Sequence, residues 1–284
     1  MMEVHTSELT DSCPQRAFLR INGKEHRQAE TALFRGLLSH AVLEVVSMGG
    51  VTTAADQWAG VVAKCHDEGR SVAAAVAANE DSICDEVDRA AGRYVEQVMP
   101  LFDEVVGVEL PVSLVIDVDG ELVRFASHID KLAIGADPYT GERSVMILDW
   151  KWRDTAPMMA YLVRNLQFGM YQYAAKWGGV QIDGWPWMLP DDLPLRAYWV
   201  HLPYLKPYKK KTTSGGETYA AGESRPLNKV LIEATCNDDD AVYAAFADRV
   251  RMMRLGFWPA IPDPVGCGLC QSSYACKAWG NHGN

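Results

Sequence analysis

The chain has 284 residues, of which 48% are hydrophobic and 23% charged, and these values exclude a disordered, collagen-like or coiled-coil protein. No stretch approaches the roughly 18 consecutive apolar residues of a membrane span. No basic region followed by an apolar core opens the sequence, so we expect no signal peptide and a cytoplasmic protein. The formal net charge of −10 disfavours general nucleic-acid binding.

The charge is unevenly distributed along the chain. Ala54 to Glu109 contains 12 acidic and 4 basic residues, whereas His201 to Val230 contains 6 basic and 2 acidic residues. An acidic total therefore does not exclude a local basic groove.

The first hundred residues read mainly as helices. An acidic, hydroxyl-rich start predicts a short capped helix over Thr6 to Arg20. Apolar residues at helical spacing predict a second helix over Thr31 to Met48. Two further helices, Thr53 to Glu68 and Asp81 to Met99, form an acidic helical insert over residues 53–100.

The pattern then changes from helical to extended. Two Val-rich runs, Val105 to Asp117 and Glu121 to Ile134, flank Asp119-Gly120, which is a strong signal for a two-residue hairpin turn. A third run covers Ser144 to Trp152. We therefore expect three consecutive antiparallel strands.

The remaining elements alternate between helix and strand and end in a cysteine-rich tail. They are a helix over Pro157 to Trp177, strands over Leu195 to Leu202 and Leu227 to Ala234, a helix over Asp238 to Leu255, and the tail over residues 259–284.

Two carboxylates and a lysine lie on the second and third predicted strands. Residues two apart in a strand share a face, so Asp149 and Lys151 point to one side while Trp150 points to the other. Together with Asp130, this arrangement can hold a divalent metal and position a water for phosphodiester hydrolysis. An exposed ion pair on an edge strand is the alternative, and this pattern alone does not separate the two.

Two helical patterns accompany these strands. His40 follows Gly36 by four residues, although a lone helical histidine is more often structural than a ligand. Gln167 and Tyr171 are also four apart, so they share one helical face.

Taken in order, these motifs resemble the PD-(D/E)xK nucleases of the RecB-like exonuclease branch. The pattern of that family is G-x-x-x-H, an acidic residue, G-R-I-D, D-x-K and Q-x-x-x-Y. The matching positions are Gly36 to His40, Glu109, His128 to Asp130, Asp149 to Lys151, and Gln167 to Tyr171. The sequence departs from the family at Ser127-His128, where G-R is expected.

The resemblance implies an α/β fold with a restriction-endonuclease-like core, in which helices flank a mixed central sheet, in a single nuclease domain spanning residues 1–284. It implies that a catalytic Mg or Mn ion is held by His40, Asp130 and Asp149, with the Trp150 carbonyl as a fourth ligand.

The resemblance also assigns roles around the metal. Lys151 would orient or activate the attacking water and stabilise charge on the phosphate. Glu109 would be an accessory acid, and Gln167 and Tyr171 would contact DNA or organise the active site. The implied activity is a metal-dependent DNA exonuclease acting on single-stranded ends, in recombination, repair or CRISPR-type adaptation.

Three of the seven cysteines form a C-x2-C-x5-C motif in the tail, at Cys267, Cys270 and Cys276, and Cys13 is the natural fourth ligand. By ligand chemistry alone, four thiolates fit zinc as well as a 4Fe-4S cluster. Their split arrangement is similar to that of AddB-type and CRISPR-associated adaptation nucleases. This similarity implies a structural 4Fe-4S cluster that joins the two ends of the chain.

Two basic clusters are candidate DNA contacts, although such runs are usually solvated loops. The first combines a tyrosine with Lys206, Lys209, Lys210 and Lys211, and the second contains Arg16 and Arg20.

The sequence contains no G-x-x-x-x-G-K-[ST] loop, so unwinding would come from a helicase or recombination partner. Two rival functions remain: a non-catalytic iron-sulfur module that binds DNA ends, and a zinc-stapled interaction protein.

Overall fold

The computed structural model describes residues 1–5, 28–29, 31–152, 165–202 and 230–256. None of the described helices is long and apolar enough to cross a membrane. The helices are α3 (Thr31–Ser47), α4 (Ala54–Asp67), α5 (Ala74–Ala77), α6 (Glu80–Gln97), α8 (Leu166–Lys176) and α10 (Asp239–Arg254), with a 3₁₀ turn, η1, at Met99–Leu101.

Among the described residues, six strands form the central sheet and two strand pairs lie outside it. The sheet order is β1-β5-β6-β9-β10, and β4 pairs with β5 outside that path. The sheet strands are β1 (Met2–His5), β4 (Phe102–Val118), β5 (Glu121–Ala136), β6 (Arg143–Lys151), β9 (Leu195–His201) and β10 (Leu231–Glu233); the small pairs are β2 (Gln28–Ala29) with β3 (Ser71–Val72), and β7 (Gln181–Ile182) with β8 (Trp185–Pro186).

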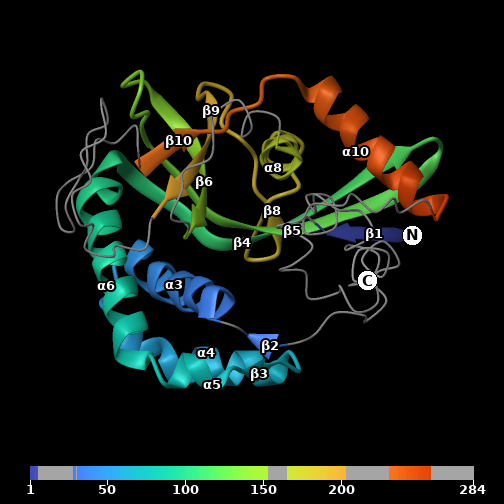
Figure 1. Cartoon of the computed structure of the whole chain (residues 1–284). Helices are drawn as coiled ribbons and strands as arrows, with labels where there is room; N and C mark the ends of the chain where they lie inside the picture. Colours follow the sequence, from blue (N-terminus) through green and yellow to red (C-terminus); the bar gives the residue numbers. More distant parts are fainter. Residues whose placement is uncertain (6–27, 30, 153–164, 203–229, 257–284) are drawn as a thin grey trace, which may run out of the picture.

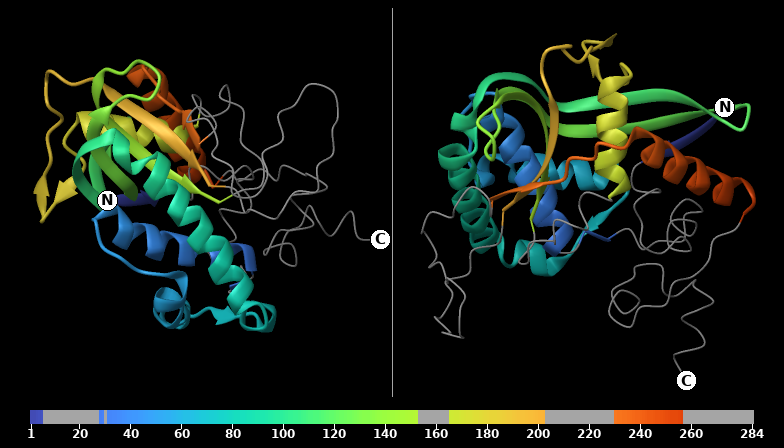
Figure 2. Two further views of the ribbon diagram at one scale, coloured as in Figure 1. Left: turned by 90° about the vertical axis from the view of Figure 1, so that its left-hand side faces the viewer. Right: turned by 90° about the horizontal axis from the view of Figure 1, so that it is seen from above.

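The sheet lies between two layers of helices (Figure 1). Helices α3, α4 and α6 lie below it in that view, and α8 and α10 lie above it; Figure 2 shows the second pair from above, across the long β4–β5 hairpin. The pairs β1–β5 and β6–β9 are parallel, whereas β4–β5, β5–β6 and β9–β10 are antiparallel. The prediction of an α/β fold with helices flanking a mixed sheet is therefore confirmed.

The β4–β5 hairpin forms where the sequence predicts it. Asp119 has φ 58° and Gly120 has φ 82°, the left-handed pair that a two-residue hairpin turn requires. The Gly120 N–H donates to Asp117 Oδ1 at 2.7 Å. The turn closes on the Val118–Glu121 pair, so the register of the hairpin follows from these few residues.

Strand β6 separates the two cores of the protein. Val145 and Ile147 pack into the core beneath α8 and α10, whereas Leu148 and Trp150 pack into the core formed with α3 and α6. The predicted alternation along this strand, with Trp150 opposite to its neighbours, is confirmed.

One edge of β5 is divided between two partners. Residues 123–126 pair with β1, and residues 131–136 pair with β6. Residues 127–130 lie between these two pairings and belong to neither, and β4 covers their other edge. The two partner strands therefore leave a gap beside the segment that contains Asp130.

A lysine is enclosed in the core next to this gap. Lys131 is 0% exposed, and its Nζ lies 4.3 Å from the centre of the Phe102 ring and 3.1 Å from Met99 Sδ. Burial lowers the pKa of Lys131 to about 7. The aromatic ring provides a cation–π contact in place of a counter-ion.

Some elements differ from the sequence-based expectations. The described part of the helix predicted over 157–177 begins at Leu166, where the Asn165 side chain accepts from the Gln167 N–H at 2.9 Å. The acidic insert contains α5 and β3 besides its two predicted helices, and the predicted strand over 227–234 is β10, which covers 231–233. Strand β1 was not predicted, because four residues without flanking turn signals carry little local pattern. The helix expected over 6–20 lies outside the described residues.

Candidate metal and catalytic site

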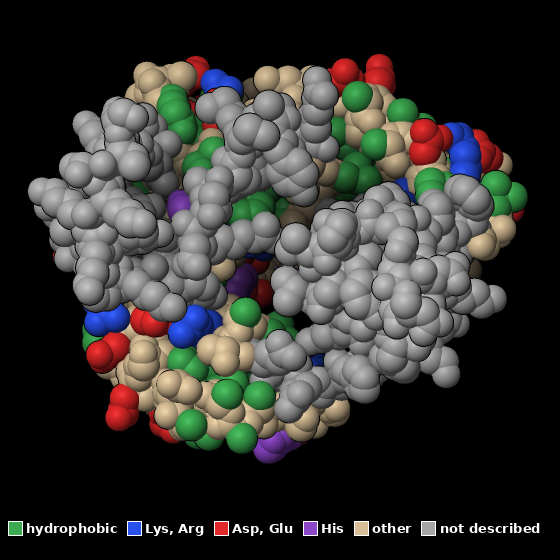
Figure 3. Space-filling model, viewed as in Figure 1, with side chains coloured by type: hydrophobic (Ala, Val, Ile, Leu, Met, Phe, Trp, Pro, Cys, Tyr) green, Lys and Arg blue, Asp and Glu red, His purple; other side chains and the backbone are tan. Residues whose placement is uncertain are grey.

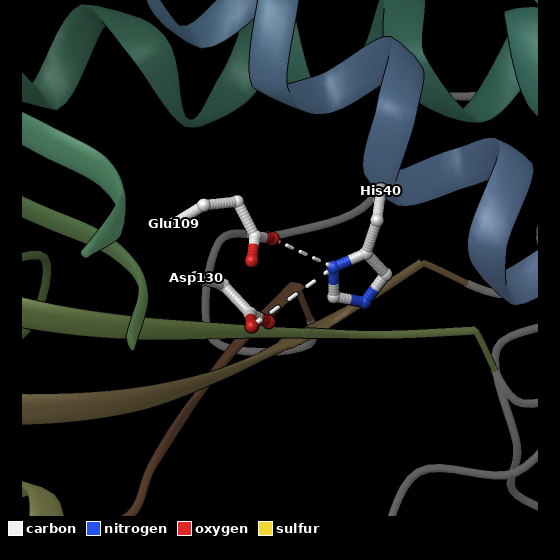
Figure 4. Close-up of side chains that lie close together, drawn as sticks. All are labelled: His40, Glu109 and Asp130. Carbon is white, nitrogen blue, oxygen red and sulfur yellow. Dashed lines mark hydrogen bonds and ion pairs between the residues drawn. The ribbon is translucent and has the colours of Figure 1, made fainter. Parts of the chain in front are cut away.

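His40 reaches the sheet from α3. Its ring packs edge-on against Trp150, with 5.6 Å between the ring centres. Its Nδ1 lies 3.3 Å from Glu109 Oε1 and 3.9 Å from Asp130 Oδ1 (Figure 4). The helix therefore directs one imidazole nitrogen at two carboxylates that come from neighbouring strands.

Glu109 and Asp130 occupy facing positions on the β4–β5 hairpin. The register pairs Val108 with Lys131 and Leu110 with Ile129 on either side of them. Glu109 has φ 50°, a left-handed conformation that is uncommon for a residue other than glycine. Such backbone costs about 1–3 kcal/mol and concentrates at functional sites. The sequence carries no signal for this conformation.

His40, Glu109 and Asp130 can each offer one ligand atom, and these atoms all lie within 4.8 Å of one another. One imidazole and two carboxylates form a donor set that suits Mn²⁺, and the carboxylates also suit Mg²⁺. The three residues therefore fit a divalent metal ion by both spacing and chemistry.

The Asp130 carboxylate sits in the gap left by the strands. Pairing of β5 with β6 ends at Lys131–Leu148, whereas β6 continues beside β9 to the Lys151–His201 pair. In place of a β5 backbone group, Asp130 Oδ2 accepts the Trp150 N–H at 2.6 Å. This hydrogen bond holds the Asp130 carboxylate at the point where β5 and β6 separate. The sequence predicted that the Trp150 carbonyl is a ligand, and that stays a prediction.

Asp149 and Lys151 form a second group beside the cluster. Lys151 Nζ lies 2.7 Å from Asp149 Oδ2. Gln167 Nε2 is 2.9 Å from Asp149 Oδ1 and 3.0 Å from Tyr171 Oη. The predicted shared faces of both residue pairs are therefore observed, and Gln167 donates a hydrogen bond to Asp149.

The structure groups the acids differently from the sequence-based expectation. Asp149, expected to be a metal ligand, is not part of the three-residue cluster, and its side chain is 1% exposed. Glu109, expected to be only an accessory acid, is part of it. Glu109 faces Asp130 across the hairpin, whereas the Asp149 carboxylate contacts Lys151 with one oxygen and Gln167 with the other. The role of Asp149 as a metal ligand stays a prediction.

Burial and charge shift the protonation of these groups. The pKa of Asp130 is raised to about 7, first by burial and then by the negative charge of Asp149. Burial opposes a charged Lys151, but Asp149 and Asp130 outweigh it and raise the pKa of the lysine. Burial likewise opposes a charged His40, yet Asp130 and Glu109 raise its pKa.

The pKa of Glu109 moves downwards, because its hydrogen bond and charge interaction with His40 outweigh the opposing effect of burial. The carboxylates of Glu109, Asp130 and Asp149 therefore lie close together, with Lys151 and His40 as the nearest cationic groups among the described residues. A divalent cation would relieve the excess of negative charge.

His40, Glu109, Asp130 and Lys151 line a cleft of about 930 Å³. Figure 3 shows a hollow near the centre of the face, with histidine and acidic side chains inside it. The cleft is bounded by α3, α4 and the sheet, which contribute, among others, His40, Glu44, Gln57, Lys64, His128 and Lys151. No motif in the sequence pointed to Gln57 or Lys64, although their spacing of seven places them on one face of a helix.

Several predicted site residues lie outside the described residues. These are the four cluster cysteines, Cys13, Cys267, Cys270 and Cys276, and the basic candidates Arg16, Arg20, Lys206, Lys209, Lys210 and Lys211. Of the described cysteines, Cys65 and Cys84 are buried, whereas Cys236 is half-buried.

Comparisons with known proteins identify no family. No model of a protein family matches the sequence, and no curated protein matches it. Among solved structures, one titled "Crystal structure of SSO0001" matches with a TM-score of 0.44 and 11% identity, covering 97% of this chain and 86% of that one.

Proposed function

We propose that this protein is a metal-dependent deoxyribonuclease with a restriction-endonuclease-like core, acting on single-stranded DNA ends. One observation carries the proposal. A cluster of His40, Glu109 and Asp130 with metal-ligand spacing lies in the same cleft as Lys151, which is held by a buried carboxylate. A metal site beside a fixed cation supports phosphodiester hydrolysis, because both stabilise the charge that develops on the phosphate.

His40, Glu109 and Asp130 would hold Mg²⁺ or Mn²⁺. The ion would supply Lewis-acid polarisation of the phosphate and a lower pKa for the attacking water. For the carboxylates to bind it, Asp130 must lose its proton, and its raised pKa makes that step sensitive to pH near neutrality.

Lys151 provides the fixed positive charge. Its side chain is 28% exposed, so the ammonium can reach a phosphate in the cleft while Asp149 holds it from one side. Its raised pKa keeps it protonated, so it donates hydrogen bonds to phosphate oxygen as charge develops there and orients the attacking water. Gln167 and Tyr171 position this pair through Asp149.

The test is cleavage of end-labelled DNA by the full chain. We expect cleavage of single strands with Mg²⁺ or Mn²⁺, with Mn²⁺ at least as effective because His40 is a softer ligand than oxygen. Equal cleavage in EDTA would contradict the metal mechanism. Binding of DNA ends without cleavage in Mn²⁺ would instead favour the non-catalytic end-binding module.

The cysteine-rich tail forms a second part of the proposal. The C-x2-C-x5-C spacing and the family resemblance support a structural 4Fe-4S cluster held by Cys13, Cys267, Cys270 and Cys276. Ligands more than 250 residues apart would close a loop long enough to stabilise the fold by several kcal/mol, by analogy with a long-loop disulfide. A partner helicase would supply unwinding.

We expect Cys13→Ser to lose iron, lower the melting temperature and promote aggregation. Protein purified without oxygen should be brown and should bleach on oxidation. Cys236→Ser is the matched control, because that thiol is half-buried, whereas Cys65 is enclosed in the core and its substitution would itself destabilise the fold. If the protein were colourless and contained stoichiometric zinc, the iron-sulfur proposal would be wrong and the four cysteines would bind zinc. The nuclease proposal would not be affected.

A further inference from the structure

One face of α4 forms a wall of the cleft that the proposed chemistry does not use. Gln57, Gly60, Val61 and Lys64 line the cleft from this helix. Their spacing of three, four and seven residues places them along a single helical stripe. The proposed metal ligands and Lys151 come from α3 and the strands, and no residue of α4 takes part in the proposed chemistry.

The stripe presents a cation from a segment that is otherwise acidic. Lys64 is one of only 4 basic residues among the 16 charged residues between Ala54 and Glu109. Its side chain is exposed and makes no ion pair or hydrogen bond with the described residues. Its charge nevertheless reaches the metal cluster, since it contributes to the lowered pKa of Glu109.

Two glycines keep the space beside this wall open. Gly36 on α3 and Gly60 on α4 both line the cleft, and a Cβ added at either would meet no atom within 4 Å. At these two positions the wall of the cleft is therefore formed by backbone. A volume of about 930 Å³ has room for a few nucleotides of one strand.

We propose that α4 is a binding wall for single-stranded DNA, on which Lys64 binds a backbone phosphate next to the one that is cleaved. The inference rests on the proposed nuclease function and deepens it by naming the residue and the helix that hold the substrate strand. Lys64 is suited to this role because a lysine binds phosphate as a mobile point charge without fixed partners. The open glycine surfaces admit the sugar-phosphate chain beside it.

The first test measures binding separately from cleavage. Anisotropy of a dye-labelled oligothymidylate is titrated with the full chain in EDTA at several salt concentrations. Loss of one phosphate contact should reduce the slope of log K against log salt by about 0.7 for a single strand, and we expect Lys64→Ala to show this change with about three- to tenfold weaker binding. Lys64→Arg should restore both quantities.

Arg89→Ala is the matched control for this charge change. Arg89 lies on α6 in the same acidic insert, away from the cleft, and its ion pair with Asp85 is 3.8 Å long and exposed. The substitution removes the same charge from the same segment but not from the cleft, so it should leave the salt slope unchanged.

In Mn²⁺, Lys64→Ala should raise KM with little change in kcat, because the contact lies away from the reacting phosphate.

The second test narrows the passage without altering charge. Gly60→Leu adds a side chain to open space in the middle of a helix, where leucine also favours helix formation, so the melting temperature should not fall. Binding should weaken at least about tenfold, because the side chain occupies the path of the strand. Gly92→Leu is the control, since Gly92 is a helical glycine on α6 with equally free space but outside the cleft.

The outcomes separate the two proposals. If wild-type protein cleaves DNA but Lys64→Ala keeps its salt slope, its affinity and its KM, the binding wall is wrong and the nuclease function stands. A fall in the kcat of Lys64→Ala with unchanged KM would also overturn the proposed binding wall, because Lys64 would then act on catalysis through Glu109 and not on binding of the strand. If wild-type protein never cleaves but shows a Lys64-dependent salt slope, the nuclease function fails and the strand-binding wall is supported.

Discussion

Lys151→Met is expected to reduce the cleavage rate by at least about 10²–10³-fold, the effect of removing one fixed donor that stabilises charge in the transition state. It is also expected to lower stability, because Asp149 would remain buried without its cation. The loss of stability should be up to a few kcal/mol, since Gln167 still donates to Asp149 and the carboxyl group can take up a proton. Single-turnover rates and melting curves would measure the two effects.

The double variant Asp149→Asn with Lys151→Met separates catalysis from folding. It removes both charges and so avoids an unpaired carboxylate, and we expect a higher melting temperature than that of Lys151→Met with no recovery of cleavage. Lys176→Met is the matched control, because Lys176 also pairs with an aspartate, Asp239, at 2.6 Å but lies outside the cleft. Near-normal cleavage by folded Lys151→Met would show that the site is assigned wrongly.

The metal-free protein is expected to lose stability between about pH 4 and pH 7 through Asp130. Its pKa in the folded protein is raised to about 7, so the folded state binds more protons than the unfolded state over this range. The stabilising contribution of the protonated carboxyl is complete at low pH and is lost as the pH rises through 7. His40 contributes in the same direction, because its pKa is raised above 6.5.

Mn²⁺ should reverse this trend. At pH 8 both groups are available as ligands, so the ion should raise the melting temperature by several degrees, and by less at pH 5, where protons compete. The variant Asp130→Asn keeps an oxygen for the Trp150 N–H but cannot ionise. Its melting temperature should therefore not rise at low pH through residue 130, and it should increase only slightly when Mn²⁺ is added. An equal Mn²⁺ response in wild type and Asp130→Asn would remove Asp130 from the metal site.

Local patterns in the sequence were sufficient for the elements that carry the site. The alternation along β6 puts Asp149 and Lys151 on one face, and the helical spacing of Gln167 and Tyr171 puts these two side chains next to each other. Asp119-Gly120 determined the hairpin turn and with it the register of β4 and β5. In each case the interaction joins residues close in sequence, so backbone periodicity or turn chemistry alone decides it.

Only the tertiary structure decided how these elements combine into a site. Asp130 lies in a gap because β1, from the start of the chain, and β6, from its middle, pair with different parts of β5. Glu109 lies beside His40 and Asp130 with a left-handed backbone conformation. Lys64 lines the cleft because α4 packs beside α3. The burial of Lys131 likewise depends on Tyr94, Met99 and Phe102. Such contacts depend on pairings between distant segments and on the packing that excludes water, and neither leaves a periodic trace in the local sequence.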